Sequence, residues 1–310
     1  MTEANGRPAG PGTIRIAVDL LGGDDSPAVV VDGALLASSA DPVLHLHLVG
    51  PPEAADEVIA ACPPADRSRF TVEPVARAVG MNDAPSRAAR HDTTVRAGVA
   101  AVADGRADAL VSAGMSGATV TAAALGLGRS PGVRKPALAA VLPTQAGPVV
   151  LLDVGASPEV STTLLLQHAI LGLAYARQTL GIHAPRLGLL SIGAEPGKGD
   201  RARRAADEAL RSAQPSYVGP VEGGDVPVGG PADVVVTDGF TGNVLLKGIE
   251  GAFVLAGGVA PHQAVPRAAA LLGVRGTVVV CHGAASAADI ASGIALAARL
   301  RQTDLVEVSR

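Results

Sequence analysis

The chain is poor in aromatic residues, with no Trp, two Tyr and three Phe among its 310 residues. Apolar residues still make up 48% of the chain, so we expect a core of Ala, Val and Leu. Small side chains of this kind allow helices to pack close to a sheet. The length suffices for one large α/β domain or for two smaller ones.

Cysteine is scarce as well. Cys62 and Cys281 are too few for a disulfide framework, and they lack the spacing of metal ligands. The seven His are dispersed along the chain. The sequence therefore predicts two reduced structural cysteines, as expected in a reducing cytoplasm, and no metal site.

Positive charge is in slight deficit, and the net charge is −4. No basic run is interleaved with aromatic residues, so nucleic-acid binding is not expected. Residues 1–12 carry charges, Pro and Gly without an apolar core, which predicts a disordered tail rather than a signal peptide. The uncharged stretch 109–128 is rich in Gly, Ser and Thr, so it indicates a strand, a loop and a helix rather than a membrane span. We expect a soluble, cytoplasmic protein.

Short apolar runs recur along the chain, and each ends in a polar or Gly-rich loop. Their nearly continuous apolar character predicts strands buried on both faces of a mostly parallel sheet. The expected strands are 14–18, 44–49, 109–112, 149–152, 187–192, 234–236 and 277–280. The expected helices are 27–39, 85–104, 160–180, 201–212, 244–255 and 286–300. This alternation predicts a three-layer α/β/α sandwich, and we prefer one domain over residues 13–310 to two.

Five loops follow predicted strands and should open at the carboxyl edge of the sheet, where α/β proteins bind ligands. They are residues 19–25, 112–118, 153–157, 193–199 and 238–243. None contains a dinucleotide or P-loop fingerprint. What remains is backbone amides, Lys198, Lys247 and Asn243, a set that suits phosphate or a carbonyl oxygen that gains negative charge.

Several motifs follow one another in a fixed order between residues 13 and 300. They are 18–24, 107–114, 136–139, 151–156, 198–199, 237–244, 246–251 and 282–283. Together they resemble the bacterial phosphate acyltransferases of phospholipid synthesis. The resemblance implies that inorganic phosphate attacks the thioester of a fatty acyl–acyl carrier protein, giving acyl phosphate and free carrier. It also implies no metal or organic cofactor, and a fold similar to isocitrate and isopropylmalate dehydrogenases and phosphotransacetylases.

The same resemblance assigns roles to two candidate catalytic residues. Lys198 would hold phosphate or offset charge on the tetrahedral intermediate, and Asn243 would donate a hydrogen bond to the same oxygen. Other candidates for binding substrate or phosphate are Gly114, Ser116, Gly117, Asp238, Gly239, Thr241, Gly242, Lys247 and His282.

Structural roles compete with these assignments. Lys198 could be a solvated loop residue, and Asn243 could be a helix N-cap. Asp238 could orient a lysine or cap the helix, Lys247 could form a salt bridge, and His282 could be structural. The basic residues Arg201, Arg203 and Arg204 could dock an acidic carrier protein, although a solvated helix face is the simpler interpretation.

The chain departs from the family pattern where Asn is usual. Met115, Ser157, Ser191 and Pro220 replace it, which puts substrate choice and activity in question. The helical hairpin expected after residue 251 is also shortened, which predicts weaker peripheral membrane association and a different or absent homodimer interface. Two alternatives follow: an altered transacylase using acyl-coenzyme A or an unusual acyl chain, and a catalytically idle homologue that binds a ligand.

Overall fold

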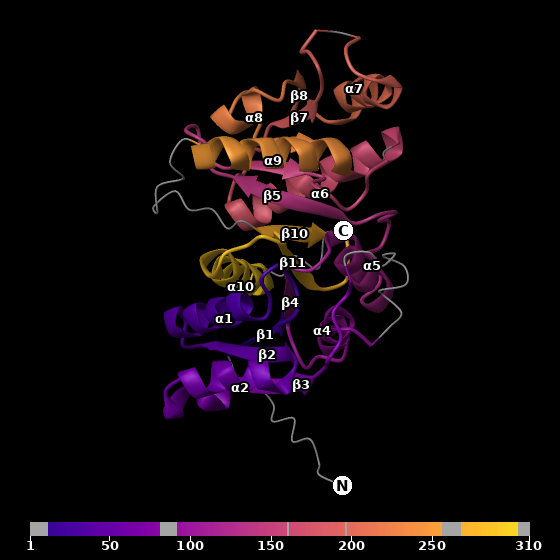
Figure 1. Cartoon of the computed structure of the whole chain (residues 1–310). Helices are drawn as coiled ribbons and strands as arrows, with labels where there is room; N and C mark the ends of the chain where they lie inside the picture. Colours follow the sequence, from indigo (N-terminus) through magenta and orange to yellow (C-terminus); the bar gives the residue numbers. More distant parts are fainter. Residues whose placement is uncertain (1–11, 81–91, 160, 196, 256–267, 303–310) are drawn as a thin grey trace. The chain divides into compact units, whose positions relative to one another are not determined.

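The computed structural model describes residues 12–80, 92–159, 161–195, 197–255 and 268–302 (Figure 1). The tail expected at 1–12 and the shortened hairpin after 251 therefore lie almost entirely outside the described residues. Contacts group the described chain into two compact units. The first contains the residues up to Gly128 and those from Arg275 onward, and the second runs from Arg129 to Val274. A single domain over 13–310 stays a prediction.

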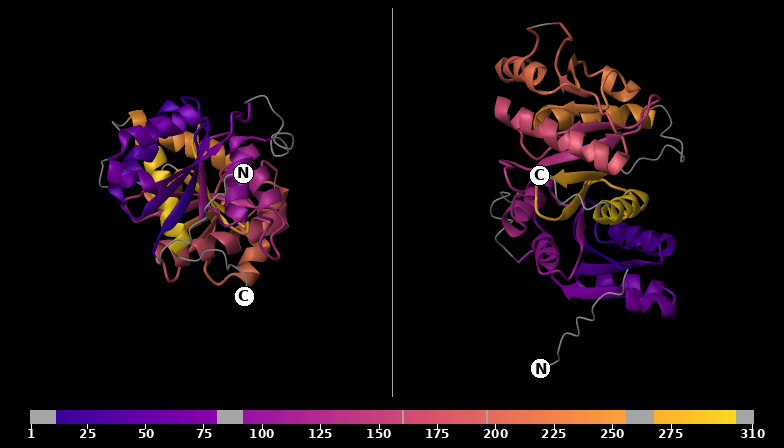
Figure 2. Two further views of the ribbon diagram at one scale, coloured as in Figure 1. Left: turned by 90° about the horizontal axis from the view of Figure 1, so that it is seen from below. Right: turned by 180° about the vertical axis from the view of Figure 1, so that it is seen from behind.

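The first unit is built on five parallel strands in the order β3-β2-β1-β4-β11. They are β1 (Ile14–Asp19), β2 (Leu44–Gly50), β3 (Phe70–Pro74), β4 (Ala109–Ser112) and β11 (Thr277–Cys281). One face carries α1 (Ala28–Ala40), α2 (Pro52–Ala61) and α10 (Ala287–Gln302), and the other carries α4 (Thr94–Ala103) and α5 (Ser116–Gly126) (Figures 1 and 2). The short helix η1 (Pro64–Arg69) leads into β3.

The second unit has six strands in the order β10-β5-β6-β9-β7-β8. They are β5 (Ala137–Leu142), β6 (Val149–Leu152), β7 (Leu187–Leu190), β8 (Tyr217–Val221), β9 (Val234–Val236) and β10 (Ala268–Leu272). Strand β5 runs antiparallel to both its neighbours, and the other pairs are parallel. Helices α6 (Thr162–Leu180) and α7 (Arg201–Ala213) cover one face, and α8 (Asp225–Val228) and α9 (Gly239–Leu255) cover the other (Figures 1 and 2). The predicted α/β fold with a mostly parallel sheet is confirmed.

The core is aliphatic, as the composition predicts. Val, Leu, Ile and Ala fill the strands, and Tyr175 is the one aromatic side chain among the largest that are fully buried in the described residues. Gly172 shows how close the helices come: a Cβ there would lie 2.7 Å from the side chains of both Leu152 and Val234. The small residue therefore lets α6 rest directly on strands β6 and β9.

All seven predicted strands are present, and the described residues form four others that were not predicted. Strands β3 and β8 are edge strands, and β8 contains Pro220, which an edge strand tolerates. Strands β5 and β10 are Ala-rich, a composition that does not distinguish helix from strand. In the described part of the chain, no helix has the length and apolar character needed to cross a membrane.

Candidate active site

Three neighbouring parallel strands of the second unit end side by side. In the register of the sheet, Val236 of β9 pairs with Leu152 of β6 on one side and with Leu189 of β7 on the other. The segments that follow these strands therefore leave at the same edge of the sheet, which is on the right of Figure 1. Lys198 and Asn243 belong to two of these segments.

The loop after β6 folds its backbone amides around its own carboxylate. Asp153 is fully buried, and its carboxylate accepts hydrogen bonds from the N–H groups of Gly155, Ala156 and Ser157 at 2.7–3.0 Å. The N–H of Leu138 at the start of β5 adds a fourth at 3.1 Å. Burial raises the pKa of Asp153, and these donors offset part of that effect. The amides of this loop thus bind a protein carboxylate rather than a ligand.

Asn243 lies inside α9, because the helix begins at Gly239, five residues earlier than predicted. The N-cap alternative for Asn243 is therefore wrong. Its carboxamide nitrogen donates to the carbonyl oxygen of Val154 at 3.0 Å. Asn243 is thereby held against the loop that follows β6.

Asp238 precedes α9 and caps it. Its carboxylate accepts a hydrogen bond from the N–H of Thr241 at 2.7 Å and another from the hydroxyl of Thr241 at 2.8 Å. It also forms an ion pair with Arg203. Burial alone would raise the pKa of Asp238, but the bonds from Thr241 and Arg203 hold it below its ordinary value. Of the two roles considered for Asp238, the capping role is confirmed.

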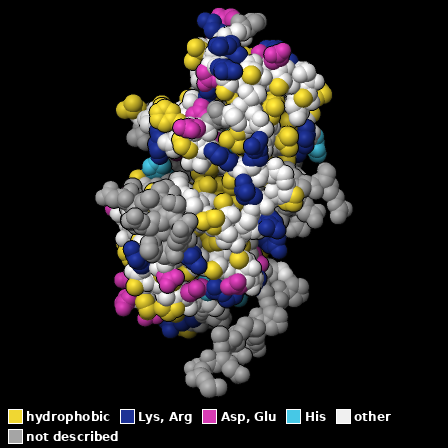
Figure 3. Space-filling view, turned by 90° about the vertical axis from the view of Figure 1, so that its right-hand side faces the viewer, with side chains coloured by type: hydrophobic (Ala, Val, Ile, Leu, Met, Phe, Trp, Pro, Cys, Tyr) yellow, Lys and Arg dark blue, Asp and Glu magenta, His cyan; other side chains and the backbone are white. Residues whose placement is uncertain are grey.

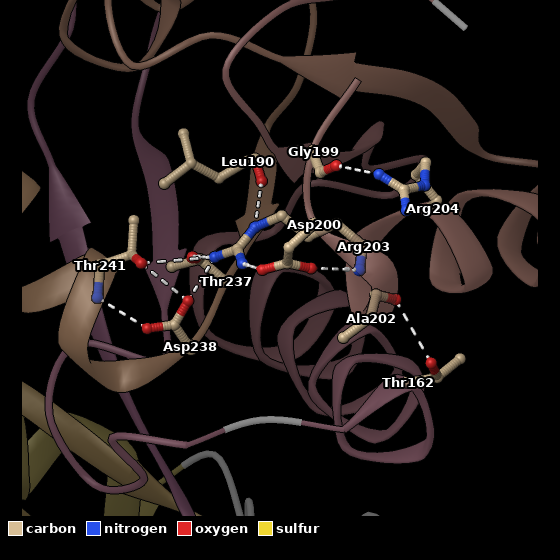
Figure 4. A network of polar contacts seen from close by, with 10 residues as sticks. All are labelled: Thr162, Leu190, Gly199, Asp200, Ala202, Arg203, Arg204, Thr237, Asp238 and Thr241. Carbon is tan, nitrogen blue, oxygen red and sulfur yellow. Dashed lines mark hydrogen bonds and ion pairs between the residues drawn. The ribbon is translucent and has the colours of Figure 1, made fainter. Parts of the chain in front are cut away.

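Arg203 is the centre of the network in Figure 4. Its guanidinium reaches from α7 to the carbonyl oxygen of Leu190 at 3.0 Å, to the Thr237 hydroxyl at 3.0 Å and to two carboxylates. The carboxylates are Asp200, which also caps α7, and Asp238. One side chain thus joins the end of β7, the start of α7 and the start of α9.

The prediction that Arg203 lies on a solvated helix face is wrong. Only 11% of its side chain is exposed. The sequence carried the signal, because Arg203, Ala206 and Leu210 follow the i, i+3, i+7 spacing of one helix face, and Ala206 and Leu210 are buried. Arg201 and Arg204 are exposed, as predicted.

Among the remaining candidates of the second unit, the two lysine side chains are exposed, whereas the backbone amides already donate hydrogen bonds within the protein. Lys198 is exposed, and Lys247 is exposed on α9 one turn after Asn243. The amides of Gly239, Thr241 and Gly242 are engaged, since they donate to Ser157 O, Asp238 Oδ1 and Asp238 O. Phosphate binding by these amides stays a prediction, and it requires exchange of those bonds. No contact that the structure describes joins Lys198 to Asn243.

Two buried polar groups at this edge were not assigned roles from the sequence. His168 of α6 is fully buried, and its Nδ1 lies 3.3 Å from the carbonyl oxygen of Thr237. Within the described residues, His168 Nε2 and the hydroxyl of Ser191 have no hydrogen-bond partner. Burial lowers the pKa of His168, which favours the neutral ring.

The first unit holds the other predicted site residues. The buried carboxylate of Asp19, at the end of β1, accepts from the Ser112 hydroxyl at 2.7 Å, and that hydroxyl accepts from the N–H of Gly114 at 3.1 Å. Ser116 and Gly117 open α5. The Nδ1 of His282 accepts from the N–H of Ala284 at 3.0 Å, which fits its structural alternative. Within the described residues, no three His, Cys, Asp or Glu gather as a metal site would require.

The sequence has close relatives over nearly its whole length. A family model described as "Fatty acid synthesis protein" matches residues 14–264. The phosphate acyltransferase of Pseudomonas putida strain KT2440 is 39% identical over 309 residues, which cover 90% of this chain and 91% of that protein.

Solved structures share the fold at low sequence identity. A phosphotransacetylase from Streptococcus pyogenes superposes with a TM-score of 0.65 at 17% identity, covering 94% of each chain. A 4-hydroxythreonine-4-phosphate dehydrogenase from Klebsiella pneumoniae gives 0.54 at 17% identity, covering 94% of this chain and 98% of that one. The dehydrogenase-like fold predicted from the sequence is thereby confirmed.

Proposed function

The chain belongs to the phosphate acyltransferase family and is an acyltransferase, and from that premise we propose that it moves a fatty acyl group from acyl carrier protein to inorganic phosphate. A phosphate oxygen attacks the thioester carbonyl carbon and forms a tetrahedral intermediate. The intermediate collapses as the carbon–sulfur bond breaks. The products are an acyl phosphate and the carrier thiol, which takes up a proton.

Lys198 and Asn243 supply the charge and the hydrogen bond that this step needs. The ammonium group of Lys198 is exposed and can pair with phosphate or with the oxyanion of the intermediate. Asn243 is anchored through Val154, and rotation of its amide would let it donate to the same oxygen. Attack by phosphate itself fits the sequence, in which no Ser or Cys stands beside an evident base.

The observation that carries this proposal is the 39% identity to a phosphate acyltransferase over 90% of the chain. The test is thiol release from purified acyl–acyl carrier protein, with phosphate varied and acyl phosphate trapped with hydroxylamine. We expect release in proportion to phosphate. Release without phosphate, or none at all, would overturn the proposal.

The donor is tested by running acyl-coenzyme A beside the carrier thioester. The replacement of an expected Asn by Met115 motivates this comparison. A higher kcat/KM for acyl carrier protein supports the proposed donor. A higher value for acyl-coenzyme A would establish the alternative transacylase.

A further inference from the structure

One segment of the second unit is basic without any acidic residue nearby in sequence. Residues 129–152 contain no Asp or Glu, and their charged side chains are Arg129, Arg134 and Lys135. We call these three residues the basic loop. The chain as a whole carries a net charge of −4, so this local excess of positive charge is not a general property of the protein.

The basic loop lies at the edge of the sheet that holds the candidate active site. It leads into β5, which runs antiparallel to β6, so the start of β5 lies beside the end of β6. Backbone bonds confirm this, because Leu138 N donates to the Asp153 carboxylate and Val154 N donates to Leu138 O at 3.0 Å. Asn243 is bonded to the same Val154.

The backbone of the basic loop is fixed on helix α6, while its charges face solvent. The side-chain oxygen of Gln167 accepts from the N–H of Arg134 at 2.6 Å, and its nitrogen donates to the carbonyl oxygen of Lys135 at 2.7 Å. The side chains of Arg134 and Lys135 are exposed, and neither forms an ion pair with a residue that the structure describes. A rigid loop with free charges is suited to binding an acidic surface.

The neighbouring helix adds an apolar contact and no opposing charge. Helix α6 contains no Asp or Glu, and Ile170, one turn after Gln167, is 54% exposed. Figure 3 looks onto this side of the structure, where Lys and Arg side chains gather without an acidic side chain between them.

We propose that the basic loop is the docking surface for the acidic acyl carrier protein, which presents its acyl thioester at this edge. The inference rests on the proposed function. A basic surface that binds anionic lipid typically has about four to eight Lys and Arg. Three charges beside one exposed Ile fit a small acidic protein better than a membrane.

The test is the charge-reversed double variant Arg134→Glu/Lys135→Glu. These side chains make no described hydrogen bonds, and Gln167 binds the backbone, so the loop keeps its fold. We expect the KM for acyl carrier protein to rise about 10-fold or more, since several rim charges are reversed. The kcat with acyl-pantetheine, which lacks the carrier, should stay within about twofold. Added salt should raise the wild-type KM and leave that of the variant nearly unchanged.

Arg177→Glu is the matched control, because Arg177 is exposed on the same helix, close to its other end. It reverses one exposed charge away from the basic loop and should leave the KM for the carrier unaltered. Direct titration of fluorescent carrier protein, without phosphate, measures docking independently of catalysis. Equal affinity of wild type and double variant would overturn the docking surface while leaving the acyltransferase function intact.

The remaining outcomes are also decisive. The wild type could bind the carrier, and the double variant could lose that binding, while the wild type shows no phosphate-dependent turnover. That result would support the docking surface and overturn the proposed reaction. Loss of binding to anionic vesicles with an unchanged KM for the carrier would assign the basic loop to a membrane and overturn the proposal.

Discussion

Arg203 and Asp238 form an ion pair between helix α7 and the residue that caps helix α9, and 11% and 9% of their side chains are exposed. The same guanidinium binds Leu190 O, at the start of the loop that contains Lys198. Arg203 therefore ties that loop to the helix that carries Asn243. Arg203 is therefore one link between the segments that carry the two proposed catalytic groups.

Arg203→Gln should lower the free energy of unfolding by about 3 kcal/mol, because it leaves the Asp238 carboxylate buried without its counter-charge. Adding Asp238→Asn should recover part of that loss, since the buried charge is then removed. Urea unfolding at neutral pH measures both. The control is Arg211→Gln on the same helix. Arg211 pairs with Asp207 and is 51% exposed, so its loss should cost less than about 1 kcal/mol. Equal losses for the two variants would show that the Arg203 network is not a buried unit.

Lys198→Met should reduce kcat by about 100- to 1000-fold, the usual effect of removing a group that stabilises an oxyanion. Because Lys198 is exposed, the free energy of unfolding should not change. Arg201→Met, an exposed charge three positions along the chain, is the control and should leave kcat within about twofold. The measurement is kcat from steady-state kinetics at saturating phosphate. A wild-type kcat in Lys198→Met would show that Lys198 has no catalytic role.

The sequence predicts the central strands well for a physical reason. Val149–Leu152 and Val234–Val236 have their predicted bounds because both are short apolar runs bordered by polar residues or Pro. Ala137–Leu142 was missed because Ala and Leu favour a helix, and only pairing with two antiparallel neighbours makes this segment a strand. Part of the decisive information there lies in β10, which is distant in sequence.

The candidate site also has features that the sequence could predict and features that it could not. The loop after β6 is polar and Gly-rich in sequence. This pattern does not show that the Asp153 side chain points inward and accepts hydrogen bonds from the backbone N–H groups of the loop. The inward direction of Arg203 could have been predicted, because it shares the spacing of the buried Ala206 and Leu210. Its partner Asp238 could not, since that contact depends on how the loops fold.

The buried ring of His168 should make stability depend on pH. Burial lowers the pKa of His168 in the folded state. If Nε2 took up a proton, the new N–H group would have no described partner to accept its hydrogen bond. The unfolded chain takes up this proton as the pH falls through about 6.5, whereas the folded chain takes it up only at a lower pH. The stabilising contribution of the neutral ring is therefore present above pH 6.5 and lost progressively as the pH falls below it.

His168→Asn should flatten this dependence, because the Asn amide can still donate to Thr237 O without titrating. Urea unfolding at a series of pH values from neutral to mildly acidic measures the slope. The exposed His183 gives the control variant, His183→Asn, which should retain the wild-type slope. An unchanged slope in His168→Asn would show that another group controls acid stability in this range.

Two glycines of helix α9 should respond in opposite directions to the same substitution. A Cβ at Gly242 would lie 2.0 Å from the carbonyl oxygen of Asp153, whereas a Cβ at Gly248 would meet nothing within 4 Å. Gly242→Ala must push α9 away from the loop after β6, at a cost of about 1–3 kcal/mol, and Asn243 moves with it. Gly248→Ala should stabilise the protein by up to about 1 kcal/mol, because Ala is the better helix former. Urea unfolding gives both values, and kcat should fall in Gly242→Ala alone. If both variants were stabilised, the close approach between α9 and the Asp153 loop, and with it the anchoring of Asn243, would be refuted.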